Sequence, residues 1–213
     1  MSHKYSSSQN ILGFLFLLLL CVNCTAQDST MKCISKTMPA NCYLNRVDKV
    51  SISHIVIHSC SDVLANPEKP YQAYNIISLF RDYKVSPHYL IDRQGTVYCL
   101  VPDNKTAKHA GIGKHKTDTL MNYQSIGIEL MGIGTPKEMK AFSINQKFYD
   151  KIPKEHLGFT EAQYLSLQQL IESLLIRHHN IKRNRAHIIG HDEHSPHRKT
   201  DPGSLFDWKK IGF

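Results

Sequence analysis

The sequence lacks the signatures of several large protein classes. No glycine-rich phosphate loop follows any candidate strand, which excludes the Rossmann and P-loop nucleotide-binding folds. There is no internal repeat or low-complexity block. The formal net charge is +8, but the lysines and arginines are not gathered into a run, so we expect no nucleic-acid partner.

The sequence also lacks an apolar run long enough to span a bilayer comfortably. Residues 11–22 are uncharged and number about a dozen, which suits the h-region of a signal peptide. We therefore expect residues 1–26 to be an export signal and the mature protein to be periplasmic. Cys24 fits a lipid-modified cysteine and Ala26 an ordinary cleavage site, so an outer-membrane lipoprotein and a secreted protein both stay open. An exported basic protein would meet anionic wall polymers and lipid head groups.

Few cysteines remain once such a signal is removed. An even number in an oxidising compartment indicates disulfides, with three possible connectivities for four cysteines. The four are Cys33, Cys42, Cys60 and Cys99. We favour the pair Cys33 and Cys42 because they are closest in the sequence.

The full chain of 213 residues, of which 41% are apolar and 21% are charged, fits one globular domain with an N-terminal extra segment. Residues 27–49 lack periodicity and are expected to form a lead or tether, with the folded domain at residues 50–213. Period-2 and period-3.6 patterns indicate strands and helices in alternation. Strands are expected at 51–57, 88–91, 96–101, 125–131 and 187–189, and helices at 71–83, 160–179 and 205–210. The second and third strands flank a turn with Gly95 and are expected to form a hairpin, and a capping box at Thr160 is expected to begin the second helix.

Two of the thirteen histidines follow directly on predicted strands. His58 comes directly after the strand at 51–57, and His191 comes after the strand at 187–189 and Gly190, so adjacent strands would place both rings at one edge of the sheet. Asp201 comes ten residues after His191, in a loop made rigid by prolines. Two histidines and one carboxylate leave the fourth tetrahedral position of zinc open, as a hydrolytic site needs. Alternatively, His58 is a core histidine, His191 a turn residue and Asp201 an Asp-Pro turn former.

Five segments together resemble the type-2 N-acetylmuramoyl-L-alanine amidase family, which includes AmpD-like and AmiD-like enzymes and peptidoglycan-recognition proteins. The resemblance covers about residues 51–210, and the segments are IVIHS, HYLID-x-x-G, KHAG, SIGIEL and GH followed by RKTDPG. It implies an α/β fold, a single domain with a central mixed β-sheet flanked by helices. It also implies roles for six residues: one zinc ion at His58, His191 and Asp201, a general base at Glu129, an oxyanion-stabilising charge at Lys199 and a substrate contact at His109.

The implied reaction is zinc-dependent hydrolysis of the amide between N-acetylmuramic acid and L-alanine, in peptidoglycan or in muropeptides. The chain departs from the family pattern in two places. Lys108 stands where many relatives have an aromatic residue, and Pro87 precedes His88-Tyr89 where phage-type members carry a catalytic tyrosine. Glu129 is therefore expected to act without that tyrosine.

Two other functions stay open at this point. Some peptidoglycan-recognition proteins keep the fold and bind wall fragments without catalysis, although these typically lose a metal ligand. A cysteine peptidase acting on wall peptides would use the thiolate of Cys60, two residues after His58, as its nucleophile. Chelation of the metal would inactivate a zinc amidase, whereas alkylation of Cys60 would inactivate a cysteine peptidase.

Overall fold

The computed structural model describes residues 33–113 and 120–213. The chain divides into two compact units, Met1–Thr30 and Met31–Phe213, and the first lies outside the described residues. The expected export signal at residues 1–26, with Cys24, therefore falls outside them too. In the described ranges, no helix combines the length and the apolar character that a membrane span requires.

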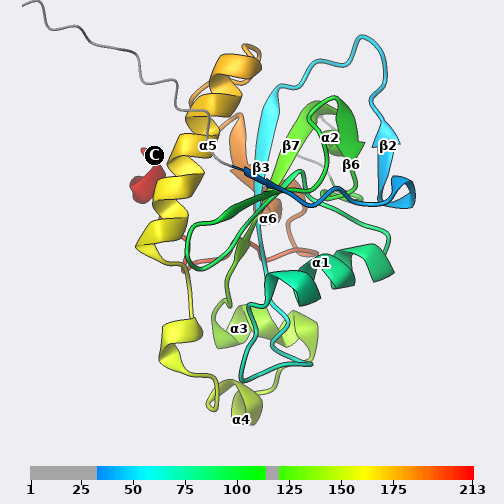
Figure 1. Ribbon diagram of the computed structural model, residues 1–213. Helices are drawn as coiled ribbons and strands as arrows, with labels where there is room; N and C mark the ends of the chain where they lie inside the picture. Colours follow the sequence, from blue (N-terminus) through cyan, green and yellow to red (C-terminus); the bar gives the residue numbers. More distant parts are fainter. Residues whose placement is uncertain (1–32, 114–119) are drawn as a thin grey trace, which may run out of the picture. The chain divides into compact units, whose positions relative to one another are not determined.

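A six-stranded mixed sheet forms the centre of the second unit (Figure 1), so the expected fold class is confirmed. The strands lie in the order β1-β5-β4-β7-β3-β8. Their bounds are β1 Cys33–Ser35, β3 His54–Cys60, β4 Tyr89–Ile91, β5 Val97–Cys99, β7 Ser125–Met131 and β8 Ile188–Gly190. Strand β3 runs parallel to both β7 and β8, whereas β4 and β5 form the expected antiparallel hairpin.

The segment expected to be a lead contributes strands from residue 33 onward. Strand β1 pairs in parallel with β5, and β2 (Tyr43–Asn45) pairs with β6 (Lys105–Ala107) in a separate two-stranded sheet. A disulfide joins Cys33 to Cys99, so the favoured pairing of Cys33 with Cys42 is wrong. The sheet brings the Cα atoms of Cys33 and Cys99 to 5.9 Å, a distance suited to a disulfide, although 66 residues separate them.

One face of the sheet packs against the long helix α5 (Glu161–Arg177). The helix begins with the expected capping box, in which the Thr160 side chain accepts from the backbone N–H of Gln163. Alternate residues of the central strands supply the apolar surface beneath it. They are Ile55 and Ile57 of β3, Ile126, Ile128 and Leu130 of β7, and Ile188 of β8.

The other face carries the intervening residues of the same strands. Helix α1 (Ala73–Asp82) packs on it through Ile76 and Ile77, against Leu90 and Met131 of the sheet. The same face also carries Ser125, Gly127 and Glu129 of β7, because alternate residues of a strand point to the same side of the sheet. This face therefore has the groups that a site needs.

Residues 132–160, which show no periodicity in the sequence, contain four short helical segments. They are α3 Pro136–Met139, η2 Lys140–Phe142, α4 Gln146–Tyr149 and η3 Lys154–His156. Arg93 fastens this stretch to the sheet by donating to the carbonyls of Glu155 (2.9 Å) and Gly158. The other short helices are η1 Ala40–Cys42, α2 Met121–Gln124, α6 His191–His194 and η4 Trp208–Ile211, the last lying near the expected terminal helix.

Candidate active site

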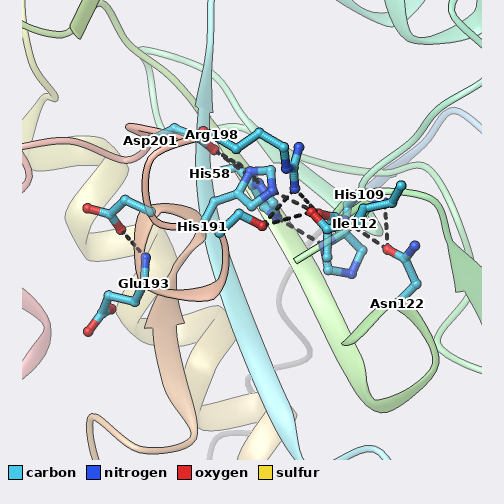
Figure 2. A network of polar contacts seen from close by, with 11 residues as sticks. His58, His109, Ile112, Asn122, His191, Glu193, Arg198 and Asp201 are labelled. Carbon is cyan, nitrogen blue, oxygen red and sulfur yellow. Dashed lines mark hydrogen bonds and ion pairs between the residues drawn. The ribbon is translucent and has the colours of Figure 1, made fainter. Parts of the chain in front are cut away.

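Three predicted metal ligands meet at the carboxyl ends of β3 and β8. The register pairs Ile57 with Gly190, so the next residues, His58 and His191, lie side by side. Nδ1 of His58 is 2.9 Å from Nδ1 of His191 and 3.1 Å from Oδ2 of Asp201, and His191 Nδ1 is 2.9 Å from the same oxygen. Figure 2 shows the three side chains converging. All three are nearly closed to solvent, with exposures of 1%, 3% and 9%.

The three atoms fit a zinc ion. His191 Nε2 lies 3.0 Å from the carbonyl of Ala110, and a carbonyl can only accept, so Nε2 has the proton and Nδ1 offers a lone pair. A lone pair of His191, a ring nitrogen of His58 and a carboxylate oxygen of Asp201 face one point. Two imidazoles and one carboxylate are the ligand set of an open, hydrolytic zinc site.

Burial and charge set the protonation of these ligands. Burial and the neighbouring His191 lower the pKa of His58 to about 4. Burial alone would raise the pKa of Asp201, but its contacts with His191 and His58 outweigh burial and hold that pKa well below the usual range. The site therefore holds a neutral His58 and an ionised Asp201 at neutral pH, the forms that bind metal.

Glu129 stands beside these ligands on β7. The parallel register pairs it with His58, so both side chains project from the same face of the sheet. Burial and the charge of Asp201 raise the pKa of Glu129 to about 8, against opposing effects of the Cys60 thiol and Lys199. Its Oε2 is buried and has no hydrogen-bond partner among the described residues. Such a carboxyl group can take up and return a proton near neutral pH.

Lys199 lines the same cavity, and its charge acts on both His58 and Glu129. Two contacts hold its loop: the Lys199 N–H donates to the carbonyl of Ser195 (3.0 Å), and the Asp192 N–H donates to that of Asp201 (2.8 Å). The loop thereby places a cation beside the ligands.

The cavity has a volume of about 520 Å³ and extends from the ligands across an apolar wall. This wall comes from α1, from the chain segments before and after it, and from the short helices after β7. It includes Leu64, Ile76, Phe80, Val85, Met139 and Phe142. A concave site with a few polar groups at one end is typical of a small-molecule or peptide-fragment site.

His109, predicted to contact substrate, lines the cavity but also touches His58 directly. Its Nδ1 is 2.9 Å from Nε2 of His58, on the side of that ring away from Asp201. All six predicted site residues therefore lie together, and the substrate role of His109 stays a prediction.

Sequence reasoning missed two residues, Asn122 and Arg198, that hold the backbone at His109 and Ala110. Asn122 Oδ1 accepts from the backbone N–H groups of His109 (3.1 Å) and Ala110 (2.8 Å). Arg198 donates to the carbonyl of Ala110 (2.9 Å). The alternation in SIGIEL indicated that Ser125 and Gly127 share a strand face with Glu129. Nothing in the sequence near Asn122 or Arg198 indicated the contacts of these two residues.

Comparison with known proteins gives consistent results. A family model described as N-acetylmuramoyl-L-alanine amidase matches residues 43–204. The 1,6-anhydro-N-acetylmuramyl-L-alanine amidase AmpD of Escherichia coli K12 is 29% identical over 188 residues, covering 83% of this chain and 90% of that protein.

Two solved structures extend the likeness to the fold. A selenomethionine derivative of AmpD aligns with a TM-score of 0.63 at 28% identity, over 85% of this chain and 93% of that one. E. coli AmiD, in complex with the substrate anhydro-N-acetylmuramic acid-L-Ala-D-gamma-Glu-L-Lys, aligns with a TM-score of 0.57 at 26% identity. That alignment covers 78% of this chain and 59% of AmiD.

Proposed function

This chain belongs to the N-acetylmuramoyl-L-alanine amidase family, and we propose that it cleaves the muramoyl–L-alanine amide of peptidoglycan fragments with a zinc ion held by His58, His191 and Asp201. The observation that carries the zinc proposal is the convergence of the three buried ligand atoms, each within 3.1 Å of the other two. The cavity beside them, about 520 Å³ in volume, is within the size range of small-molecule sites.

The residues divide the chemistry between them. Zinc at this position would polarise the amide carbonyl and lower the pKa of water, which is otherwise a poor nucleophile. Glu129 takes the proton that water loses as it attacks the carbonyl carbon, and returns it to the nitrogen of L-alanine as the carbon–nitrogen bond breaks. The ammonium of Lys199 stabilises the negative charge that develops on the carbonyl oxygen. The products are a muramic acid carboxylate and a peptide with a free amino end.

Both alternative functions lose support. A recognition module without catalysis would not need the complete set of ligands, base and cation that lies around this cavity. A cysteine nucleophile would need a thiolate, but burial raises the pKa of Cys60 well above its usual value, and the charge of Glu129 raises it further. Cys60 is therefore a protonated thiol beside the base.

We also propose that the enzyme works outside the cytoplasm, anchored by lipid at Cys24. The supporting features are the uncharged stretch at residues 11–22 and the Cys33–Cys99 disulfide, because disulfides persist in oxidising compartments. Cell fractionation of wild type and Cys24→Ser tests this. The variant should lose its acyl label and leave the membrane fraction, whereas cytosolic protein with an intact Met1 would contradict export.

Metal analysis and product analysis of the purified mature chain test the amidase proposal. We expect about one zinc per chain and release of a free L-alanine amino terminus from an anhydro-muramyl tripeptide, seen by mass spectrometry. A chelator should stop the reaction, and added zinc should restore it. Undiminished cleavage by protein shown to be free of metal would refute the zinc proposal.

A further inference from the structure

A hydrogen-bond chain runs behind His58, away from the metal ligands. Nε2 of His58 lies 2.9 Å from Nδ1 of His109, and Nε2 of His109 lies 3.1 Å from Oγ of Ser125. The Ser125 hydroxyl in turn donates to the backbone carbonyl of Met121. Figure 2 shows His109 on the opposite side of His58 from Asp201.

The carbonyl at the end of this chain fixes the position of every proton in it. A carbonyl only accepts, so the single hydroxyl proton of Ser125 points to Met121. Ser125 Oγ must then accept from His109, which places the proton of His109 on Nε2. A neutral imidazole holds one proton, so Nδ1 of His109 has none and can only accept.

The same reasoning gives the proton position of the metal ligand His58. Because Nδ1 of His109 accepts, His58 must donate from Nε2. A neutral His58 protonated at Nε2 leaves its Nδ1 lone pair directed at His191 and Asp201. The ligand tautomer is thus set by a carbonyl three hydrogen bonds away.

The surroundings hold the His109 ring in this orientation. A Cβ atom added at Gly127 would lie 2.3 Å from Cγ of His109, so the ring packs directly on the β7 backbone. Ser125 and Gly127 face the same side of β7 as Glu129, and Asn122 fixes the His109 backbone. Strand β7 therefore supplies the acceptor and the space for this ring.

We propose that His109, with Ser125, is a positioning residue that holds His58 in the zinc-binding tautomer. The inference rests on the proposed zinc site. A metal-bound histidine commonly donates its second ring N–H to a carboxylate, a carbonyl or water. His191 does so to the Ala110 carbonyl at 3.0 Å. At His58, a second imidazole with a fixed proton takes the place of that carbonyl.

Nuclear magnetic resonance of zinc-loaded wild type, labelled with ¹⁵N at histidine, tests the proton order. We expect His58 and His109 to carry their protons on Nε2, and a coupling across the hydrogen bond between His58 Nε2 and His109 Nδ1. A proton on Nδ1 of His109 would overturn the proposal. If zinc shifts neither His58 nor His191, the zinc site itself fails, which is a separate result that removes this inference with it.

Zinc affinity, measured by competition with a chromophoric chelator, tests the consequence. Loss of the proton order in Ser125→Ala or His109→Met should weaken binding by about 10- to 100-fold. His109→Gln should retain more affinity than His109→Met, because an amide can accept from His58 and donate to Ser125. Ser53→Ala is the matched control, since it removes a serine–histidine contact of 2.8 Å to His54 at the other end of β3 and should leave zinc binding unchanged.

The opposing role, a substrate contact by His109, gives the reverse pattern. In that case His109→Met and Ser125→Ala would bind zinc as tightly as wild type, while KM for a muropeptide would rise in His109→Met alone. This result would overturn the positioning role and leave the proposed zinc site standing.

Discussion

Strands β3 and β8 carry a histidine pair at each end, and only one pair resembles a metal site. His58 and His191 follow the paired segment, whereas His54 and His187 precede it, four residues earlier on each strand. At the carboxyl end the ring centroids are 4.4 Å apart and the rings meet edge to face. At the amino end they are 5.1 Å apart and stacked, with an interplanar angle of 17°.

The neighbours of each pair explain the difference. Asp201 lies within 3.1 Å of both His58 and His191, and both rings are buried. At the other end, Ser53 is the neighbour: its carbonyl lies 2.7 Å from Nδ1 of His187 and its hydroxyl 2.8 Å from Nδ1 of His54. Two histidines on adjacent strands are therefore not enough, since a metal site also needs a carboxylate and a buried position.

The largest expected effect separates the two pairs directly. His191→Ala should reduce the zinc content from about one per chain to nearly none and abolish cleavage, because two ligands remain at an open site. The matched variant His187→Ala removes the same side chain at the other end of β8 and should keep both zinc and activity. Metal analysis and a cleavage assay on the two proteins decide this. Equal zinc loss in both variants would show that the two histidine pairs do not differ in metal binding.

The next effect separates binding from chemistry at the carboxyl end. Glu129→Gln keeps the shape of the side chain but cannot accept a proton, so kcat should fall about 10²- to 10⁴-fold. Zinc content should stay near one per chain, because Glu129 is not a ligand. Turnover at saturating substrate and metal analysis measure the two quantities. Near-normal turnover would remove Glu129 from the mechanism.

A smaller effect is expected on the pH dependence of stability, through the buried His88. Burial and the charge of Arg46 lower the pKa of His88 to about 3. Between about pH 6.5 and pH 3 the unfolded chain binds a proton there that the folded chain does not, so stability falls as the pH falls through this range.

Urea unfolding of chelator-treated protein at several pH values from 7 to 4 measures this dependence. His88→Gln should reduce its slope by up to roughly 1 kcal/mol per pH unit. An unchanged slope in His88→Gln would contradict a neutral, buried His88 in the folded chain.

The smallest effect is expected at Cys60, two residues beyond His58. Cys60→Ala removes one hydrogen bond from a thiol, a weak donor, to Glu129, a change of about 0.5–1.5 kcal/mol, so activity should fall by no more than about tenfold. Steady-state kinetics of this variant and of alkylated wild type provide the measurement. Complete loss of activity in Cys60→Ala, with zinc retained, would support Cys60 as the nucleophile.

Much of the fold could be predicted because its signals are local. The apolar alternation of residues 125–131 and the capping box at Thr160 predicted β7 and α5 with nearly correct bounds. The short helices of residues 132–160 were not predicted, because segments of three or four residues give no periodicity. A local signal was present but missed, namely the capping box of Thr135 and Glu138 with Pro136 at the start of α3. Strand β1 was missed for a similar reason, since three residues give no periodicity and their pairing with β5 is long-range.

The sequence by itself determined which side chains could serve as ligands, base and cation, because residue type, strand ends and the family motif are all readable along the chain. Only the tertiary structure decided how they act. It paired Cys33 with Cys99 rather than with Cys42, because sheet register governs which cysteines meet. It also brings His109 into contact with His58 and places Asp201 beside one of the two histidine pairs, His58 and His191. Hydrogen-bond direction and burial depend on groups far apart in the chain, and no local pattern encodes them.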